Sequence, residues 1–156
     1  MKVIIEGVDG VGKTTLAKQI AKLFNLEYCH DSKPRTFKEY SEELINGKDR
    51  VYDRFFFGQF AGYQSKSERL ISKKQLIHLL ELCRSSGIII ILCYDKVENI
   101  LKRFKHNDSD IEWMKKTGFN NAKEFVSTIQ NGFFDVAELG GAYINYIDMS
   151  MVIPNE

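Results

Sequence analysis

The stretch VIIEGVDGVGKTT, residues 3–15, contains the pattern G-x-x-x-x-G-K-[ST] from Gly7 to Thr14. The apolar residues before the pattern predict a buried strand, and the spacing of apolar residues after it predicts a helix over residues 15–24. Glycines in such a loop let the backbone approach phosphate groups closely, and the N–H groups that open the helix point at the negative charge. This arrangement predicts a binding site for a nucleoside triphosphate.

The residues of this phosphate loop have individual expected roles. Those expected to contact the phosphates are Gly7, Gly10, Val11, Gly12, Lys13, Thr14 and Thr15. Lys13 is expected to reach the β- and γ-phosphate oxygens as a catalytic cation, and the Thr14 hydroxyl is expected to be a ligand of Mg²⁺. A chance match in an ordinary loop is the alternative, and the strand before the pattern and the helix after it argue against that alternative.

Length and composition favour one domain over residues 1–156, because 44% of the residues are hydrophobic and no Pro-, Gly- or Ser-rich stretch suggests a linker. The net charge of +1 argues against a nucleic-acid partner, which needs a clearly basic surface. The longest apolar run, residues 88–94, is too short to span a membrane, and the first strand follows Met1 without an expected signal peptide. We therefore expect a cytoplasmic protein without a membrane partner.

Short strands and helices are expected to alternate along the rest of the chain. Strands are predicted at residues 26–29, 51–52, 88–94 and 143–148, and helices at residues 37–45, 55–64, 72–86, 96–105 and 120–139. Such alternation indicates a parallel sheet covered by helices on both faces. We predict a three-layer α/β/α fold with a five-stranded parallel sheet, and a site at the carboxyl ends of its strands.

Charged residues follow two of the predicted strands. Asp53 is the expected second contact for Mg²⁺, through water, because Mg²⁺ takes one or two carboxylates and keeps several waters. The alternative is that Asp53 caps the following helix. Arg54 can donate two hydrogen bonds to a phosphate, and a surface ion pair is the alternative for this residue. Asp31 follows another predicted strand and opens the segment that contains Arg35.

Several segments, in order along most of the chain, resemble the thymidylate kinases and more broadly the deoxynucleotide kinases of the P-loop kinase superfamily. The matching segments are the phosphate loop at residues 5–15, G-K…V-Y-D-R-F at residues 47–55, A-G-Y-Q at residues 61–64, the helix at residues 125–137, and I-D-M-S at residues 147–150. The third segment has one residue more than the A-Y-Q of the family. The resemblance implies a P-loop NTPase fold, a homodimer, and phosphoryl transfer from ATP with Mg²⁺ to a small-molecule deoxynucleotide.

The resemblance also implies roles for particular residues. Asp9 matches the acid that holds the 3′-hydroxyl of the acceptor sugar, and Asp148 and Ser150 lie in the segment that matches the loop against the adenine of ATP. Gly10 stands where some members have an arginine, and members without it supply the transition-state cation from a lid, here residues 103–118. Arg103 is the first candidate for that cation and Lys105 the second, because charge develops on the transferred phosphoryl oxygens. A solvated position on a helix face is the alternative for Arg103.

The acceptor-binding region departs from the family. About forty residues separate Lys13 from Asp53, whereas full-length thymidylate kinases have a longer insertion there; the region here is reduced to residues 31–47. In this respect the chain resembles compact thymidylate kinase-like proteins of large bacteriophages. The candidates for the acceptor phosphate are Arg35, Arg54 and Arg69, those for stacking on the base are Phe56, Phe57, Phe60 and Tyr63, and Gln64 belongs to the same substrate set. Aromatic residues at helical spacing more often belong to the core.

Three functions remain open from the sequence. The first is transfer to a deoxynucleoside monophosphate, dTMP or a related deoxypyrimidine nucleotide. The second is transfer to the 5′-hydroxyl of a deoxynucleoside, for which Asp31 is the candidate general base. The third is a nucleotide-dependent switch or binding module without catalysis, which the absence of an N-K-x-D motif makes less favoured.

Overall fold

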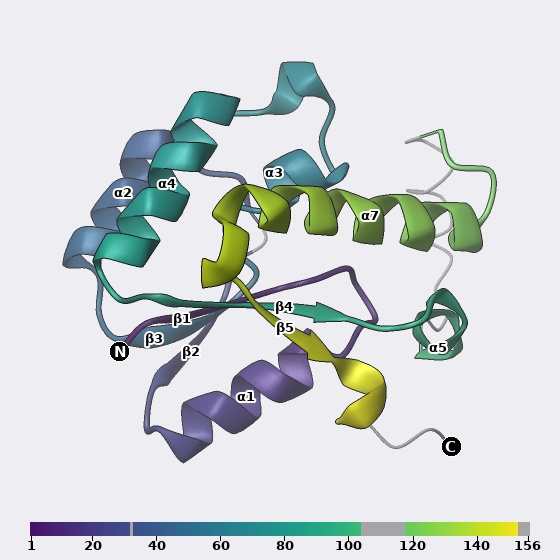
Figure 1. Cartoon of the computed structure of the whole chain (residues 1–156), viewed down its shortest axis with the longest axis horizontal. Coiled ribbons are helices and arrows are strands. Elements are labelled where there is room, and N and C mark those ends of the chain that lie inside the picture. Colours follow the sequence, from purple (N-terminus) through teal and green to yellow (C-terminus); the bar gives the residue numbers. More distant parts are fainter. Residues whose placement is uncertain (32, 104–117, 153–156) are drawn as a thin grey trace.

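A computed structural model describes residues 1–31, 33–103 and 118–152 (Figure 1). Its sheet has five strands, all parallel, in the order β2-β3-β1-β4-β5. The strands are β1 (Val3–Glu6), β2 (Glu27–His30), β3 (Arg50–Asp53), β4 (Ile89–Tyr94) and β5 (Asn145–Asp148). The predicted number of strands and their parallel arrangement are confirmed.

Helices cover both faces of the sheet. They are α1 (Lys13–Leu23), α2 (Phe37–Asn46), α3 (Gly58–Ala61), α4 (Lys73–Ser85), α5 (Val97–Arg103) and α7 (Ala122–Gly140), with short 3₁₀ turns η1 (Lys66–Glu68), η2 (Gly141–Tyr143) and η3 (Met149–Met151). In Figure 1, α1 lies on one side of the sheet, and α2, α4 and α7 lie on the other. This is the predicted three-layer α/β/α architecture. Among the described residues, no helix combines the length and the apolarity that crossing a membrane requires.

The central strands are apolar because both of their faces are covered. Val3, Ile4 and Ile5 of β1 are buried, as are Ile90 and Leu92 of β4. In the parallel register, Ile5 lies opposite Asp53 on one side and Ile91 on the other. The carboxyl ends of β1, β3 and β4 therefore meet at one edge of the sheet, which is the edge where the phosphate loop begins.

The predicted helix over residues 55–64 is wrong in its extent, because only the single turn α3 forms there. Arg54 has a left-handed backbone with φ of 73°, and Gly62 ends α3 with φ of 115°. The long helix α7 passes close to this turn, and a Cβ on Gly132 would lie 2.0 Å from the Ala61 carbonyl oxygen. The segment after β3 is thus shaped by its neighbours and not by its own helical spacing.

The predicted helix over residues 96–105 forms as α5 up to Arg103. The interior of the predicted lid, residues 103–118, and with it Lys105, lies outside the described residues.

Candidate active site

The phosphate loop, residues 7–14, joins β1 to α1 and has the backbone that its glycines predict. Gly12 is the N-cap of α1 with φ of 100°, and Gly10 has φ of 86°. A Cβ on Gly7 would lie 2.7 Å from the Cys93 carbonyl oxygen, so glycine is also needed here for space. No described side chain caps α1 at Gly12. The first N–H groups of this helix are therefore available to an anion.

Asp53 lies beside the start of α1, as the sequence predicts for a magnesium contact. Its carboxylate is fully buried, and its Oδ2 accepts a hydrogen bond of 2.6 Å from the Thr14 hydroxyl. Its Oδ1 is buried without a hydrogen-bond partner among the described residues. Burial raises the pKa of Asp53, but hydrogen bonds from Thr14, Tyr28 and His30 and the charge of Lys13 outweigh burial and hold it below the ordinary value. The group is therefore an ionised carboxylate with one oxygen left for a cation.

These residues fit a magnesium ion bound together with phosphate and water. Mg²⁺ prefers oxygen ligands and few carboxylates, and Thr14 and Asp53 supply one hydroxyl and one carboxylate oxygen. Across the described parts of the chain, no three His, Cys, Asp or Glu side chains form a group that could hold a metal ion by themselves. Thr14 and Asp53 would hold Mg²⁺, which would offset phosphate charge.

A second set of charged residues meets at Asp9 in the phosphate loop. Lys13 Nζ lies 3.3 Å from Asp9 Oδ1, and the Arg54 guanidinium donates to the same oxygen. The Arg54 guanidinium also lies over the Tyr63 ring, 4.5 Å from its centroid, and the Asp9 N–H donates to the Tyr63 hydroxyl at 3.0 Å. Lys13 is only 5% exposed, so its side chain is enclosed by the protein although it belongs to the phosphate loop. Asp9 itself holds Lys13 inside the site.

The buried carboxylate of Glu6, at the end of β1, supports this arrangement. Its Oε2 accepts hydrogen bonds from the N–H groups of Phe55 at 3.1 Å and Phe57 at 2.9 Å. The Arg54 N–H donates to the Ile5 carbonyl at 2.8 Å. These three bonds bend the chain after β3 and aim Arg54 at the phosphate loop. Sequence reasoning assigned no role to Glu6, although a carboxylate inside an apolar strand was a signal.

Glu6 predicts a pH dependence of stability. Burial raises the pKa of Glu6 from 4.5 to about 7, against the lowering effect of its two backbone hydrogen bonds and of Arg54 and Lys13. The pKa of Glu6 in the folded state is above its ordinary value. The contribution of protonated Glu6 to the free energy of unfolding is therefore complete below about pH 4.5 and is lost as pH rises through about 7. The wild type loses this contribution as pH rises, whereas Glu6→Gln has no group to ionise. We therefore expect the unfolding free energy of Glu6→Gln, relative to that of the wild type, to increase by about 3 kcal/mol when pH is raised from 4.5 to 8.5.

Urea denaturation at both pH values measures this difference. Glu42→Gln is the matched control, because Glu42 is exposed on α2 and forms an exposed ion pair with Lys38 at 3.9 Å. The same pH dependence in Glu6→Gln and the wild type would show that Glu6 is not buried as described.

Arg103 reaches the phosphate loop from α5. Its Nη1 donates to the carbonyl oxygens of Gly10 at 3.2 Å and Val11 at 2.8 Å, and its Nη2 donates to Asp95 Oδ2. The carboxylate of Asp95 is buried, and the Gln130 amide pairs with the backbone N–H and C=O of Asp95. The alternative of a solvated helix position for Arg103 is wrong. The positive charge of Arg103 is partly neutralised by Asp95. The contacts of Gln130 with Asp95 were not predicted from the sequence.

On the acceptor side, Arg35 and Asp31 form an ion pair of 2.7 Å. Burial raises the pKa of Asp31, against the opposing effect of Arg35. The Arg69 guanidinium lies 4.4 Å from the Phe60 ring centroid, and its Nε donates to the Gln59 carbonyl at 2.9 Å. Arg54 thus pairs directly with the phosphate loop, whereas Arg35 pairs with Asp31 and Arg69 binds the Gln59 carbonyl.

The aromatic residues predicted to contact the base fall into two groups, one in the core and one beside Arg54. Phe56 and Phe57 are both fully buried, so the prediction that Phe57 binds substrate is wrong because its ring belongs to the core. Tyr63 and Gln64 instead line a small, partly open cavity of about 20 Å³, which Arg54 also lines. Gln64 Oε1 and Arg54 Nε are buried without hydrogen-bond partners in the described part of the chain.

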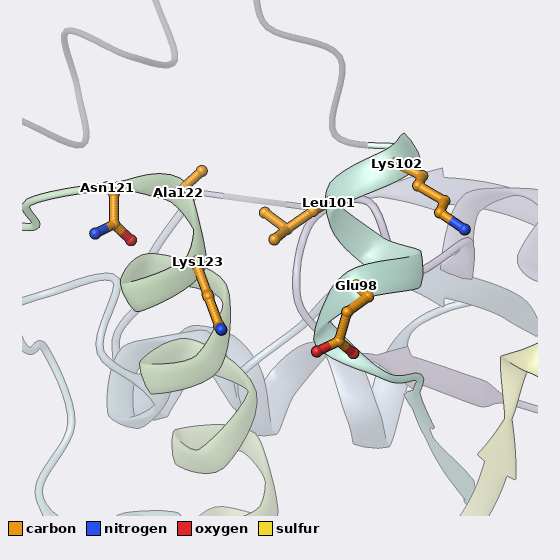
Figure 2. Close-up of a pocket in the computed structure, with 6 residues that line it drawn as sticks. All are labelled: Glu98, Leu101, Lys102, Asn121, Ala122 and Lys123. Carbon is orange, nitrogen blue, oxygen red and sulfur yellow. The ribbon is translucent and has the colours of Figure 1, made fainter.

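Two further regions border the strand ends. Asp148 Oδ1 accepts hydrogen bonds from the Ser150 N–H at 3.0 Å and the Ser150 hydroxyl at 2.7 Å, which forms the turn η3 after β5. A separate hollow of about 620 Å³ lies between α5 and the first turn of α7. Figure 2 shows Leu101 pointing across it toward Ala122. This hollow contains none of the predicted site residues.

Comparisons with known proteins found similarity in sequence and in fold. No protein-family model matches the chain. A probable thymidylate kinase of Picrophilus torridus is 29% identical over 115 residues, which are 73% of this chain and 53% of that protein. The chain thus matches about half the length of this curated relative.

Solved structures share the fold at low sequence identity. The YorR protein of Bacillus subtilis, solved with phosphorylated GDP, has a TM-score of 0.74 and 15% identity, covering 96% of this chain and 86% of that one. Deoxyadenosine kinase of M. mycoides, solved with dCMP and a flexible dCDP, has a TM-score of 0.59 and 13% identity, covering 96% and 90%. Thymidylate kinase of Candida albicans has a TM-score of 0.51 and 14% identity, covering 94% and 82%.

The sheet order, the phosphate loop and these neighbours define the fold as that of a P-loop kinase. In sequence, the chain is similar to a probable thymidylate kinase over the matched 115 residues.

Proposed function

We propose that this protein transfers a phosphoryl group from Mg²⁺-ATP to a deoxynucleoside monophosphate, dTMP or a related deoxypyrimidine nucleotide. The observation that carries the proposal is that Lys13 and Arg54 converge on one oxygen of Asp9. One cation comes from the donor side of the site and the other from the end of β3. A monophosphate acceptor brings its own negative charge, and a site for two phosphate groups needs cations from both sides.

Phosphoryl transfer depends mainly on positioning and on stabilising charge, and the residues of the site supply both. Lys13 binds the β- and γ-phosphate oxygens, with the open N–H groups of α1 around them. Arg54 binds the acceptor phosphate, and both cations leave Asp9 as the phosphates bind. Asp9 then accepts a hydrogen bond from the sugar 3′-hydroxyl.

We assign the other predicted residues roles around the two phosphate groups. Asp148 and Ser150 lie against the adenine, and Tyr63 and Gln64 border the acceptor base. Arg103 supplies transition-state charge from its position on the carbonyl oxygens of Gly10 and Val11, which supports its choice over Lys105. The similarity to a thymidylate kinase supports dTMP as the acceptor.

A second function is favoured by one observation. Asp31 directly follows β2, and its carboxylate is buried and paired with Arg35. A carboxylate there would serve as the general base for a nucleoside 5′-hydroxyl. The similarity in fold to deoxyadenosine kinase is compatible with this alternative.

A panel of acceptors tests the proposal. The purified protein is incubated with Mg²⁺-ATP and each of the common deoxynucleosides and deoxynucleoside monophosphates, and ADP release and product mass are measured. We expect a diphosphate product, formed fastest from dTMP or another deoxypyrimidine nucleotide. Faster conversion of a nucleoside to its monophosphate would favour the second function, and no product from any acceptor would contradict both.

A further inference from the structure

The side chain of Tyr28 reaches Asp53 from the neighbouring strand. β2 pairs with β3 in parallel, and His30 lies opposite Asp53 in the register. Tyr28 and His30 are two residues apart and so face the same side of the sheet, with Cys29 facing the other side. The Tyr28 hydroxyl donates a hydrogen bond to Asp53 Oδ2, and His30 Nδ1 lies 3.4 Å from the same atom.

The two oxygens of the Asp53 carboxylate have different contacts. Oδ2 receives the hydroxyl groups of Thr14, from the first turn of α1, and of Tyr28, from β2. Oδ1 is buried and has no hydrogen-bond partner within the described residues. Two donors from different elements on one oxygen fix the rotation of the carboxylate and leave Oδ1 without a hydrogen-bond partner among the described residues.

We propose that Tyr28 is a positioning residue for the magnesium site, which fixes the rotation of the Asp53 carboxylate that would hold the ion. The inference rests on the proposed function, because it takes Thr14 and Asp53 as the residues that hold Mg²⁺ beside ATP. Hydrogen-bond partners of metal ligands orient those ligands, and their loss commonly lowers metal affinity or activity by about 10 to 100-fold. Tyr28 acts through Asp53 and does not itself touch the ion.

The surroundings of Tyr28 keep its hydroxyl a donor. The Asp53 carboxylate that it faces only accepts hydrogen bonds, so the Tyr28 hydroxyl is the donor in this contact. Lys18 Nζ lies 5.4 Å from the centroid of its ring. This contact involves the ring and not the hydroxyl, so a phenylalanine at the same position retains it.

The experiment compares ATP affinity with and without Mg²⁺ in Tyr28→Phe and the wild type. Isothermal titration calorimetry measures the dissociation constant for ATP in excess Mg²⁺ and again in EDTA, and the ratio of the two constants reports the contribution of the metal. We expect Tyr28→Phe to reduce this ratio about ten-fold or more. We expect the dissociation constant in EDTA to stay within about two-fold of the wild type, because the ring and the phosphate loop are retained.

Tyr143→Phe is the matched control, because its hydroxyl donates a 3.0 Å hydrogen bond to the Cys83 carbonyl away from the phosphate loop. We expect its metal ratio to equal that of the wild type. An unchanged ratio in Tyr28→Phe, or an equal loss of affinity with and without Mg²⁺, would overturn the inference and leave the proposed function standing. A wild-type protein that binds no ATP would overturn both.

Discussion

Lys13→Ala is expected to lower the rate of phosphoryl transfer by at least about 10³-fold, because removal of one preorganised charge donor from a transition state commonly has an effect of this order. Lys13 is the single cation supplied by the G-K-[ST] part of the phosphate loop, and it is held beside Asp9 at 3.3 Å. The acceptor preferred in the panel and Mg²⁺-ATP are used at saturation, and ADP release is measured. Asp9 keeps its contact with Arg54 in the variant, so the loop retains one ion pair.

The control for Lys13→Ala is Lys22→Ala, because Lys22 is exposed in the last turn of the same helix. Lys13→Met serves as a second variant, since it removes the charge and keeps most of the buried side-chain volume. Circular dichroism and urea denaturation check that the variants fold. Turnover in Lys13→Met within about ten-fold of the wild type, with fold retained, would contradict the kinase function.

Arg54→Ala is expected to lower kcat/KM for a monophosphate acceptor by about 10² to 10³-fold, because it removes the cation proposed for the acceptor phosphate. Asp31→Asn is expected to lower it by less than about ten-fold, since a phosphate acceptor is already anionic and needs no strong general base. For a nucleoside acceptor the order is reversed, and loss of the Asp31 base lowers the rate by about 10² to 10⁴-fold. Steady-state kinetics with each class of acceptor measure both variants.

Arg84→Ala is the control for Arg54→Ala. Arg84 is exposed near the end of α4 and pairs with Glu81 at 2.8 Å. Because α4 leads into the start of β4, Arg84 lies at the opposite edge of the sheet from the phosphate loop. An active Arg54→Ala together with an Asp31→Asn that is inactive on thymidine would replace the proposed function by its alternative.

The fold and the phosphate loop could be predicted because their signals are local. The positive φ angles of Gly10 and Gly12 and the close approach at Gly7 are backbone requirements that glycine meets at those positions. The apolar run of β4 reflects burial on both faces, and the residues from Ile90 to Cys93 are buried. Asp53 could be predicted to lie beside the loop because a residue at the end of a parallel strand lies at the edge where the loop begins.

The segment after β3 could not be predicted in the same way. Its spacing indicates a helix over residues 55–64, but Glu6 binds the N–H groups of Phe55 and Phe57, 49 and 51 residues away in the sequence. These bonds bend the backbone before a helix can form and bury the ring of Phe57. The position of Arg103 on Gly10, 93 residues away, is likewise invisible to local spacing.

The sequence by itself determined the α/β class, the phosphate loop and the carboxylate at the end of β3, because these follow from backbone dihedrals, side-chain periodicity and strand ends. Only the tertiary structure decided that Arg54 shares Asp9 with Lys13, that Arg103 lies on the phosphate loop, and that Tyr28 holds Asp53. The register of β2 against β3 and the burial of Glu6 place these groups within hydrogen-bond reach. Such contacts join residues that are far apart in the chain. The type of each residue and its sequence neighbours do not indicate which distant residue it contacts.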